Sequence, residues 1–302
     1  MNSDKPILVT GAAGNIGAVG NTITSLLLER GFAVRAMVHR DDDRAQSLRD
    51  KGAEVVIGDL LDLNDMHRII EGCGTLYFGM SVSDQYLEAS INVAAVALHH
   101  KVEAFINMSQ MTLSQMSITE TTDSPQHKLH WLAEQALNWS GLPVVHVRPT
   151  VFMDGFFLKF SAPTIKTRDA LLLPFGEGKT SPIAATDVAL AVTEILVNPQ
   201  PHLGEVYHLT GPECEDVRYY ASVFTEVLGR PITYTDVPVA AWREAVKGAG
   251  LPDHVIDHLS TMGDLHRAGR YARMTDDFVK LTGKEPITAK TFIERHAASF
   301  AK

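Results

Sequence analysis

The chain has 302 residues, of which 45% are hydrophobic and 21% are charged, proportions typical of an ordinary folded globular protein. Its formal net charge of -9 argues against nucleic acid as a partner, because binding a phosphate backbone needs a basic face. The only cysteines, Cys73 and Cys214, lie too far apart for a disulfide framework or a metal motif, which suits a reducing compartment. We recognise no secretion signal and no apolar run of membrane-spanning length, so we expect a cytoplasmic protein with no membrane partner.

The first apolar run, residues 7–9, ends in a glycine-rich turn. Glycines follow at 11, 14 and 17, and leucines then recur with helical spacing. Glycine lets the backbone turn tightly and approach a ligand, and the free amides at a helix start favour a phosphate. The pattern predicts a turn that binds a dinucleotide pyrophosphate through Thr10, Gly11, Ala13, Gly14, Asn15, Ile16 and Gly17. The alternative is a turn that uses glycine for structural reasons only. The stretch from 17 to 31 is slightly longer than this arrangement requires.

The second predicted strand, residues 33–38, runs into three basic side chains, His39, Arg40 and Arg44. In dinucleotide-binding folds an acidic residue at this place holds the ribose 2′-hydroxyl, whereas arginine suits a 2′-phosphate. The residues therefore favour NADP(H), with NAD(H) as the alternative. The aspartates at 41–43 also fit a solvated, charged turn with no ligand.

Strands and helices alternate through the rest of the first half. The pattern predicts helices over 44–51, 64–70, 86–99 and 127–139, and strands over 54–60, 75–80, 104–109 and 143–149. This order predicts an α/β fold with a Rossmann-like, doubly wound parallel sheet, whose ligands bind beyond the carboxyl ends of the strands. Cofactor contacts are expected there from Asp59, Leu60, Gly79, Met80 and Ser109. Asp59 would receive the adenine amino group or, alternatively, cap the following turn.

After Pro149 the pattern loosens. A helix over 186–196 and a strand over 205–209 are predicted to return to the sheet. Helices over 217–228, 239–248 and 276–281, with a strand over 232–235, predict a smaller, mainly helical lobe. We therefore expect a nucleotide-binding core of residues 1–155 with 181–210, and a substrate lobe of residues 211–302 with 156–180. His254 and His258 have metal-compatible spacing but no third ligand, so we predict surface histidines and no metal site.

These residues together resemble the NmrA-like branch of the atypical short-chain dehydrogenases, nearly from end to end. The segments that carry the resemblance are 10–17, 40–45, 58–60, 140–143, 148–149, 204–211 and 250–253. The last two are similar to bacterial NAD(P)H:quinone oxidoreductases of this branch. The resemblance implies reduction of quinones or related conjugated, aromatic small molecules. Other members of the branch are redox-sensing regulators that bind the dinucleotide without turnover, and this alternative stays open, as does a homodimer.

The chain departs from the wider superfamily at its catalytic helix, where the usual pattern is Tyr-x-x-x-Lys. Aligning on Glu134 places Gln126 in the tyrosine position and His130 in the lysine position. In another register Lys128 takes the lysine position with Ser124 in that of the tyrosine. Neither register contains a tyrosine, which disfavours an ordinary carbonyl-to-alcohol dehydrogenase.

Three catalytic candidates remain. His130 could donate a proton, because imidazole titrates near neutral pH, or it could be a solvent-facing histidine. Lys128 would take the role of the catalytic lysine in the second register. Ser109 matches the superfamily's catalytic serine, or it caps a strand end. The resemblance further implies that Met153 and Phe156 lie against nicotinamide and substrate, although a phenylalanine cluster over 152–160 also fits a hydrophobic core.

Overall fold

The computed structural model describes residues 5–14 and 18–302, which form two compact units. Residues 1–110, 128–148 and 188–207 make up the first unit, and residues 111–127, 149–187 and 208–302 make up the second. Both units therefore consist of segments that are far apart in the sequence. Within the described residues, no helix is both long and apolar enough to cross a membrane.

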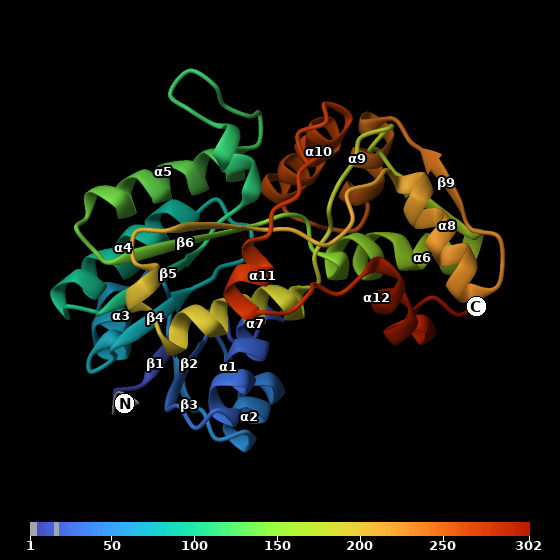
Figure 1. Cartoon of the computed structure of the whole chain (residues 1–302). Coiled ribbons are helices and arrows are strands. Elements are labelled where there is room, and N and C mark those ends of the chain that lie inside the picture. The colour runs from blue at the N-terminus through green and yellow to red at the C-terminus, as the bar shows by residue number, and fades with distance from the viewer. Residues whose placement is uncertain (1–4, 15–17) are drawn as a thin grey trace. The chain divides into compact units, whose positions relative to one another are not determined.

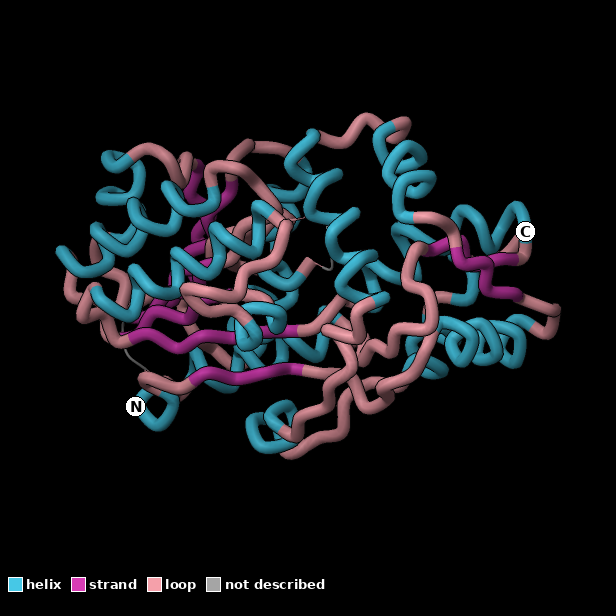
Figure 2. The backbone as a smooth tube through the Cα atoms, turned by 90° about the horizontal axis from the view of Figure 1, so that it is seen from above, coloured by secondary structure: helices cyan, strands magenta, loops and turns pink. Residues whose placement is uncertain are grey.

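A parallel sheet organises the first unit (Figures 1 and 2). Its strands, among the described residues, are β1 (Ile7–Val9), β2 (Val34–Val38), β3 (Glu54–Ile57), β4 (Thr75–Phe78), β5 (Ala104–Met108), β6 (Val144–Pro149) and β8 (Val206–Leu209). The order is β3-β2-β1-β4-β5-β6-β8, and the pairs from β3 through β6 are parallel. Strand order reverses beside β1, so β1 and β4 flank the switch point at which such sheets bind ligands. The predicted doubly wound sheet is confirmed.

Helices cover this sheet. They are α1 (Val19–Glu29), α2 (Asp43–Asp50), α3 (Leu63–Ile70), α4 (Tyr86–His99), α5 (Pro125–Trp139) and α7 (Ala185–Val197). Buried side chains of α3, α4 and α5 share one hydrophobic cluster with Phe78 of β4 and Phe105 of β5. Arg30, which directly follows α1, pairs with Glu194 of α7 at 2.6 Å, and these two helices lie together in Figure 1. The central strands are apolar on both faces because helices bury both.

The second unit is mainly helical around a small parallel strand pair. It contains a π-helical turn (Asp154–Ser161), α6 (Ala162–Arg168), β7 (Ala170–Leu173), α8 (Val217–Leu228), β9 (Thr233–Asp236), α9 (Val239–Lys247), α10 (Asp253–Arg267), α11 (Asp277–Thr282) and α12 (Ala289–Arg295). Strands β7 and β9 pair in parallel. Phenylalanines from the π-helical turn, α8 and α12 pack against one another in its core, as at Phe157, Phe224 and Phe292.

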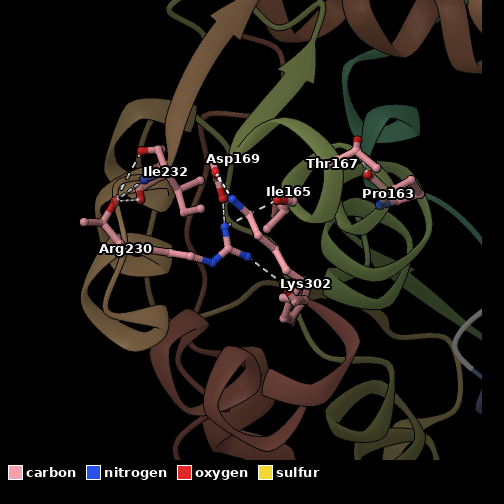
Figure 3. A network of polar contacts seen from close by, with 10 residues as sticks. Pro163, Ile165, Thr167, Asp169, Arg230, Ile232 and Lys302 are labelled. Carbon is pink, nitrogen blue, oxygen red and sulfur yellow. Dashed lines mark hydrogen bonds and ion pairs between the residues drawn. The ribbon is translucent and has the colours of Figure 1, made fainter.

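A polar cluster fixes the C-terminal residues within the second unit (Figure 3). Asp169, in a left-handed backbone conformation between α6 and β7, accepts an ion pair from Arg230 and another from Lys302 at 2.6 Å. Arg230 also donates to the carbonyl oxygen of Phe300 at 2.7 Å. The carboxylate of Asp169 therefore joins three distant parts of the chain.

Candidate functional site

The end of β1 and the end of β4 meet at the glycine turn. The Thr10 hydroxyl donates to the Gly79 carbonyl at 3.0 Å and accepts from the Gly79 amide at 2.9 Å. Gly11 has a left-handed φ of +64°, and a methyl group in place of its hydrogen would lie 2.7 Å from the Gly79 oxygen. Two of the predicted cofactor residues, Gly11 and Gly79, thus meet backbone to backbone at the switch point of the sheet.

The first helix approaches this turn through Gly20. A methyl group on Gly20 would lie 2.6 Å from the Gly11 carbonyl oxygen, whereas the amide of Gly14 donates to that same oxygen at 3.0 Å. Close helix packing is the role of the third glycine of a dinucleotide fingerprint. Gly17, which we predicted as the last glycine of the pyrophosphate-binding turn, lies with Asn15 and Ile16 outside the described residues. Gly20, the second residue of α1, makes the close contact with the glycine turn that such packing requires.

The loop after β2 reaches back to the glycine turn. Arg44 donates to the carbonyl oxygen of Ala13 at 2.9 Å and to the carboxylate of Asp42 at 3.0 Å. Asp42 also accepts the amides of Arg44 and Ala45 and so caps α2, and the Arg44 guanidinium lowers the pKa of the Asp42 carboxyl. His39 and Arg40 are exposed at the end of β2. The side chains of His39 and Arg40 are therefore accessible to an anionic ligand.

Asp59 and Leu60 follow β3, and both are half-buried. The carboxylate of Asp59 accepts the Leu61 amide at 3.0 Å, which is the turn-capping contact that we weighed as its alternative role. The Asp59 amide in turn donates to Asp65 at 3.0 Å. Met80, beyond β4, is half-buried and packs against the large hydrophobic cluster of the first unit. The loop after β3 is therefore ordered by its own hydrogen bonds.

Ser109 belongs to a buried ion-pair network that sequence reasoning missed. Its hydroxyl donates to the carboxylate of Glu134 at 2.5 Å, and Arg148 donates two hydrogen bonds to that same carboxylate. The Glu134 side chain is 1% exposed and that of Arg148 is 15% exposed. Ser109 directly follows β5, Glu134 lies in α5 and Arg148 lies in β6. The Ser109 hydroxyl therefore uses its one donor hydrogen in the bond to Glu134, and only its oxygen lone pairs remain, as acceptors.

His130 is buried, so the alternative of a solvent-facing histidine is wrong. It is 5% exposed, and its ring centroid lies 3.8 Å from that of Tyr86 of α4. The Tyr86 hydroxyl donates to the carbonyl oxygen of Met108, and burial, followed by the charge of Glu134, raises the pKa of that phenol. Lys128, six residues before Glu134 on α5, is exposed. Of the two helical candidates, only His130 is enclosed within the first unit.

Helix α5 starts earlier than we predicted, at Pro125 instead of residue 127. The Ser124 hydroxyl accepts the His127 amide at 3.2 Å, so Ser124 caps the helix and Pro125 occupies the first turn, where proline is favoured. Ser124 also bonds to His258 at 2.9 Å, and Gln126 bonds to His254 at 2.7 Å. His258 is 4% exposed, so our prediction of surface histidines is wrong for it.

The predicted substrate contacts are buried in the second unit. Met153 is 1% exposed and Phe156 is 4% exposed, and both belong to its hydrophobic core. The Phe156 ring lies 4.6 Å from Phe157 and 5.5 Å from Phe175. This packing agrees with the alternative that the phenylalanine cluster forms a hydrophobic core. A substrate contact at either residue stays a prediction.

Comparisons with known proteins agree with this architecture. The profile of the NmrA-like family matches residues 3–292. The NAD(P)H azoreductase of Xenophilus azovorans is 27% identical over 95% of this chain and 97% of its own. Among solved structures, the NADPH-dependent quinone oxidoreductase of Escherichia coli in complex with NADPH has a TM-score of 0.84 at 22% identity, over 96% and 99% of the two chains. The negative transcriptional regulator NmrA in complex with NADP has a TM-score of 0.79 at 18% identity, over 97% and 95%. Both structural likenesses show a shared fold.

Proposed function

The chain belongs to the NmrA-like family, and on that premise we propose that it is an NAD(P)H-dependent reductase. Its substrate in this proposal is a small conjugated acceptor, quinone-like by default, with azo and imine compounds as further candidates. The azoreductase relative and the quinone oxidoreductase neighbour support this class of reaction. The observation that carries the proposal is the glycine turn at the strand switch point, with exposed basic side chains beside it.

The residues of the turn fit a dinucleotide. Positions 11 and 20 both lack room for a methyl group, so the backbone there comes closer than any side chain would allow. Among the described residues, no side chain caps the start of α1, which leaves its first amides for a phosphate. Thr10, Gly11, Ala13 and Gly14 would hold the pyrophosphate, and Gly79 and Met80 would lie near the ribose and nicotinamide.

The loop after β2 supports NADPH over NADH. Arg40 and His39 are exposed where a ribose 2′-phosphate would lie, and a guanidinium can hold such a phosphate through two hydrogen bonds. Arg44 is already bound to Asp42 and to the turn, so its first role is to fix the loop. Arg40 is therefore the residue that we expect to distinguish the two nucleotides.

The catalytic helix supports an acceptor that needs little acid catalysis. The reduced nicotinamide supplies hydride when bound, and the protein has to hold an acceptor about 3–3.5 Å away in a water-poor site. Gln126 stands in the tyrosine position, and the Ser109 hydroxyl donates its hydrogen bond to Glu134. A quinone spreads the added charge over its ring system, so a single donor suffices. His130, buried beside Tyr86, is our candidate to deliver that proton.

Steady-state NADPH oxidation against a panel of quinones, azo dyes and imines tests the proposal. We expect sustained turnover with at least one class, and a His130→Ala variant should lose turnover at nearly constant NADPH affinity. Lys128→Ala is the matched control, because Lys128 is an exposed cation on the same helix. If His130→Ala keeps the parent rate while Lys128→Ala loses it, the second register is correct.

A dinucleotide-binding sensor without turnover is the second candidate. It is favoured by the missing tyrosine and by the serine hydroxyl that is already bonded to Glu134. Saturable NADPH binding with no turnover across the whole panel would support it and would end the enzyme proposal.

A further inference from the structure

Three histidines from two neighbouring helices meet on the first unit. His67 lies in the last turn of α3, His99 is the last residue of α4, and His100 follows it directly. The Nε2 atom of His100 lies 3.0 Å from the Nδ1 atom of His67, and one nitrogen of each ring lies within 4.8 Å of the other two. No part of the nucleotide proposal uses these rings.

The geometry is close to that of a metal centre. Imidazole binds zinc at about 2.0–2.1 Å, so two imidazole nitrogens on a tetrahedral ion lie about 3.3 Å apart. The 3.0 Å between the His67 and His100 nitrogens therefore needs to widen only slightly, and His99 has to turn toward the other two rings. His67 and His99 are exposed and His100 is half-buried, which leaves room for the rings to rotate and for an ion to enter from water.

The helices that carry the rings are firmly anchored. Met66 and Ile69 of α3 and Val96 of α4 belong to the large hydrophobic cluster of the first unit. The His100 amide donates to the Val96 carbonyl at 3.0 Å, which closes the end of α4. The backbone positions of the three histidines are thus set by buried packing before any ion binds.

The local charge favours a cation. Both helices end here, and a helix carries a partial negative charge at its C-terminus. Glu71, which follows the last residue of α3, places a negative charge near His100.

We propose that His67, His99 and His100 form a binding site for a divalent transition-metal ion of the zinc class. Imidazole ligands select zinc, nickel or copper ions over magnesium or calcium ions, which prefer oxygen. The proton between His100 and His67 moves through solvent to the other nitrogen of its ring, so both rings bind as neutral ligands. Water completes the coordination.

The site lies away from the glycine turn. Each helix runs back from the carboxyl end of one parallel strand to the amino end of the next, so the ends of α3 and α4 lie at the amino edge of the sheet. The glycine turn is at the carboxyl edge. We therefore expect the metal to cross-link α3 and α4 without changing NADPH binding.

Calorimetric titration of the tag-free, chelator-treated full chain with ZnCl2 tests the site. We expect one ion per chain, and His67→Ala and His100→Ala should each weaken zinc binding about tenfold or more. His202→Ala is the matched control, because it removes a histidine elsewhere in the same unit. MgCl2 should not bind there. No zinc binding by the parent chain, or equal affinity in the parent and the triple variant H67A/H99A/H100A, would overturn the proposal.

Thermal unfolding provides a second readout that does not depend on enzymatic activity. The exposed positions of the rings predict that the metal-free variants unfold near the parent temperature. Zinc should raise the unfolding temperature of the parent and of His202→Ala, but not that of the triple variant. An equal rise in the triple variant would place the bound zinc elsewhere and end this assignment.

Discussion

Two regions at the carboxyl edge of the same sheet are built in opposite ways. At the turn after β1, backbone contacts between Gly11, Gly20 and Gly79 define the shape, and exposed basic side chains stand beside it. At the end of β5, Ser109, Glu134 and Arg148 are buried and bonded to one another. The comparison shows that the first region leaves basic side chains exposed, as our proposal of a nucleotide site requires, whereas the polar side chains of the second region are bonded to one another in the interior.

The largest effect should come from breaking the buried ion pair. Glu134→Gln leaves the Arg148 guanidinium without its carboxylate, and loss of one partner of a buried pair costs about 3–5 kcal/mol of unfolding free energy. Urea unfolding measures it. Glu194→Gln is the matched control, because the more exposed pair of Glu194 with Arg30 should contribute about 1 kcal/mol or less. Equal losses of unfolding free energy in the two variants would show that the buried pair contributes no more to stability than the more exposed one.

His258, a buried histidine of α10 that bonds to the α5 cap Ser124, extends the comparison to pH. Burial, followed by the nearby His254, lowers the pKa of His258 to about 4. The unfolded chain therefore binds this proton at a higher pH than the folded chain. Neutral His258 leaves the free energy of unfolding undiminished above about pH 6.5, and protonation of the unfolded chain lowers it by about 3 kcal/mol as the pH falls to 4.

His258→Gln, which keeps a polar partner for Ser124, should therefore flatten the acid limb of the stability profile. Unfolding free energies of parent and variant at several pH values between 7 and 4 provide the test, and His266, also buried, is common to both proteins. Parallel profiles would show that His258 does not resist protonation.

The glycine turn should respond to added volume. Gly20→Ala places a methyl group 2.6 Å from the Gly11 carbonyl oxygen, and such overpacking costs about 1–3 kcal/mol. The displaced helix start should also weaken NADPH binding about tenfold or more. Gly248→Ala, where the nearest atom is 3.4 Å away, is the control. Unchanged nucleotide affinity in Gly20→Ala would show that the start of α1 does not contribute to nucleotide binding.

The smallest effect should separate the two arginines of the loop. Arg40→Ala should weaken NADPH about tenfold, or about 1.4 kcal/mol, and leave NADH unchanged. Arg44→Ala should weaken both nucleotides, because Arg44 fixes the turn through Ala13. Nucleotide titrations of the two variants give the comparison. Equal losses of NADPH and NADH in Arg40→Ala would end its role with the 2′-phosphate.

The sequence predicted the parts of this structure that depend on local pattern. Regular alternation of apolar runs and helical spacing gave the parallel sheet, and the glycines marked its switch point. Gly20, which lies in the segment that we found slightly too long, was given no role, because glycines at 11, 14 and 17 already completed a regular spacing. The Glu134 network could not be predicted, because its partners come from β5 and β6 and meet only in the folded sheet. The His67 cluster is hidden for the same reason, with about thirty residues between its members.

The most direct test of the account is a binding titration of the purified chain with NADPH and with NADH. We predict saturable binding of one nucleotide per chain, tighter for NADPH, and weakened by Gly20→Ala. Absence of affinity for both nucleotides would contradict the central claim that the turn after β1 holds a dinucleotide.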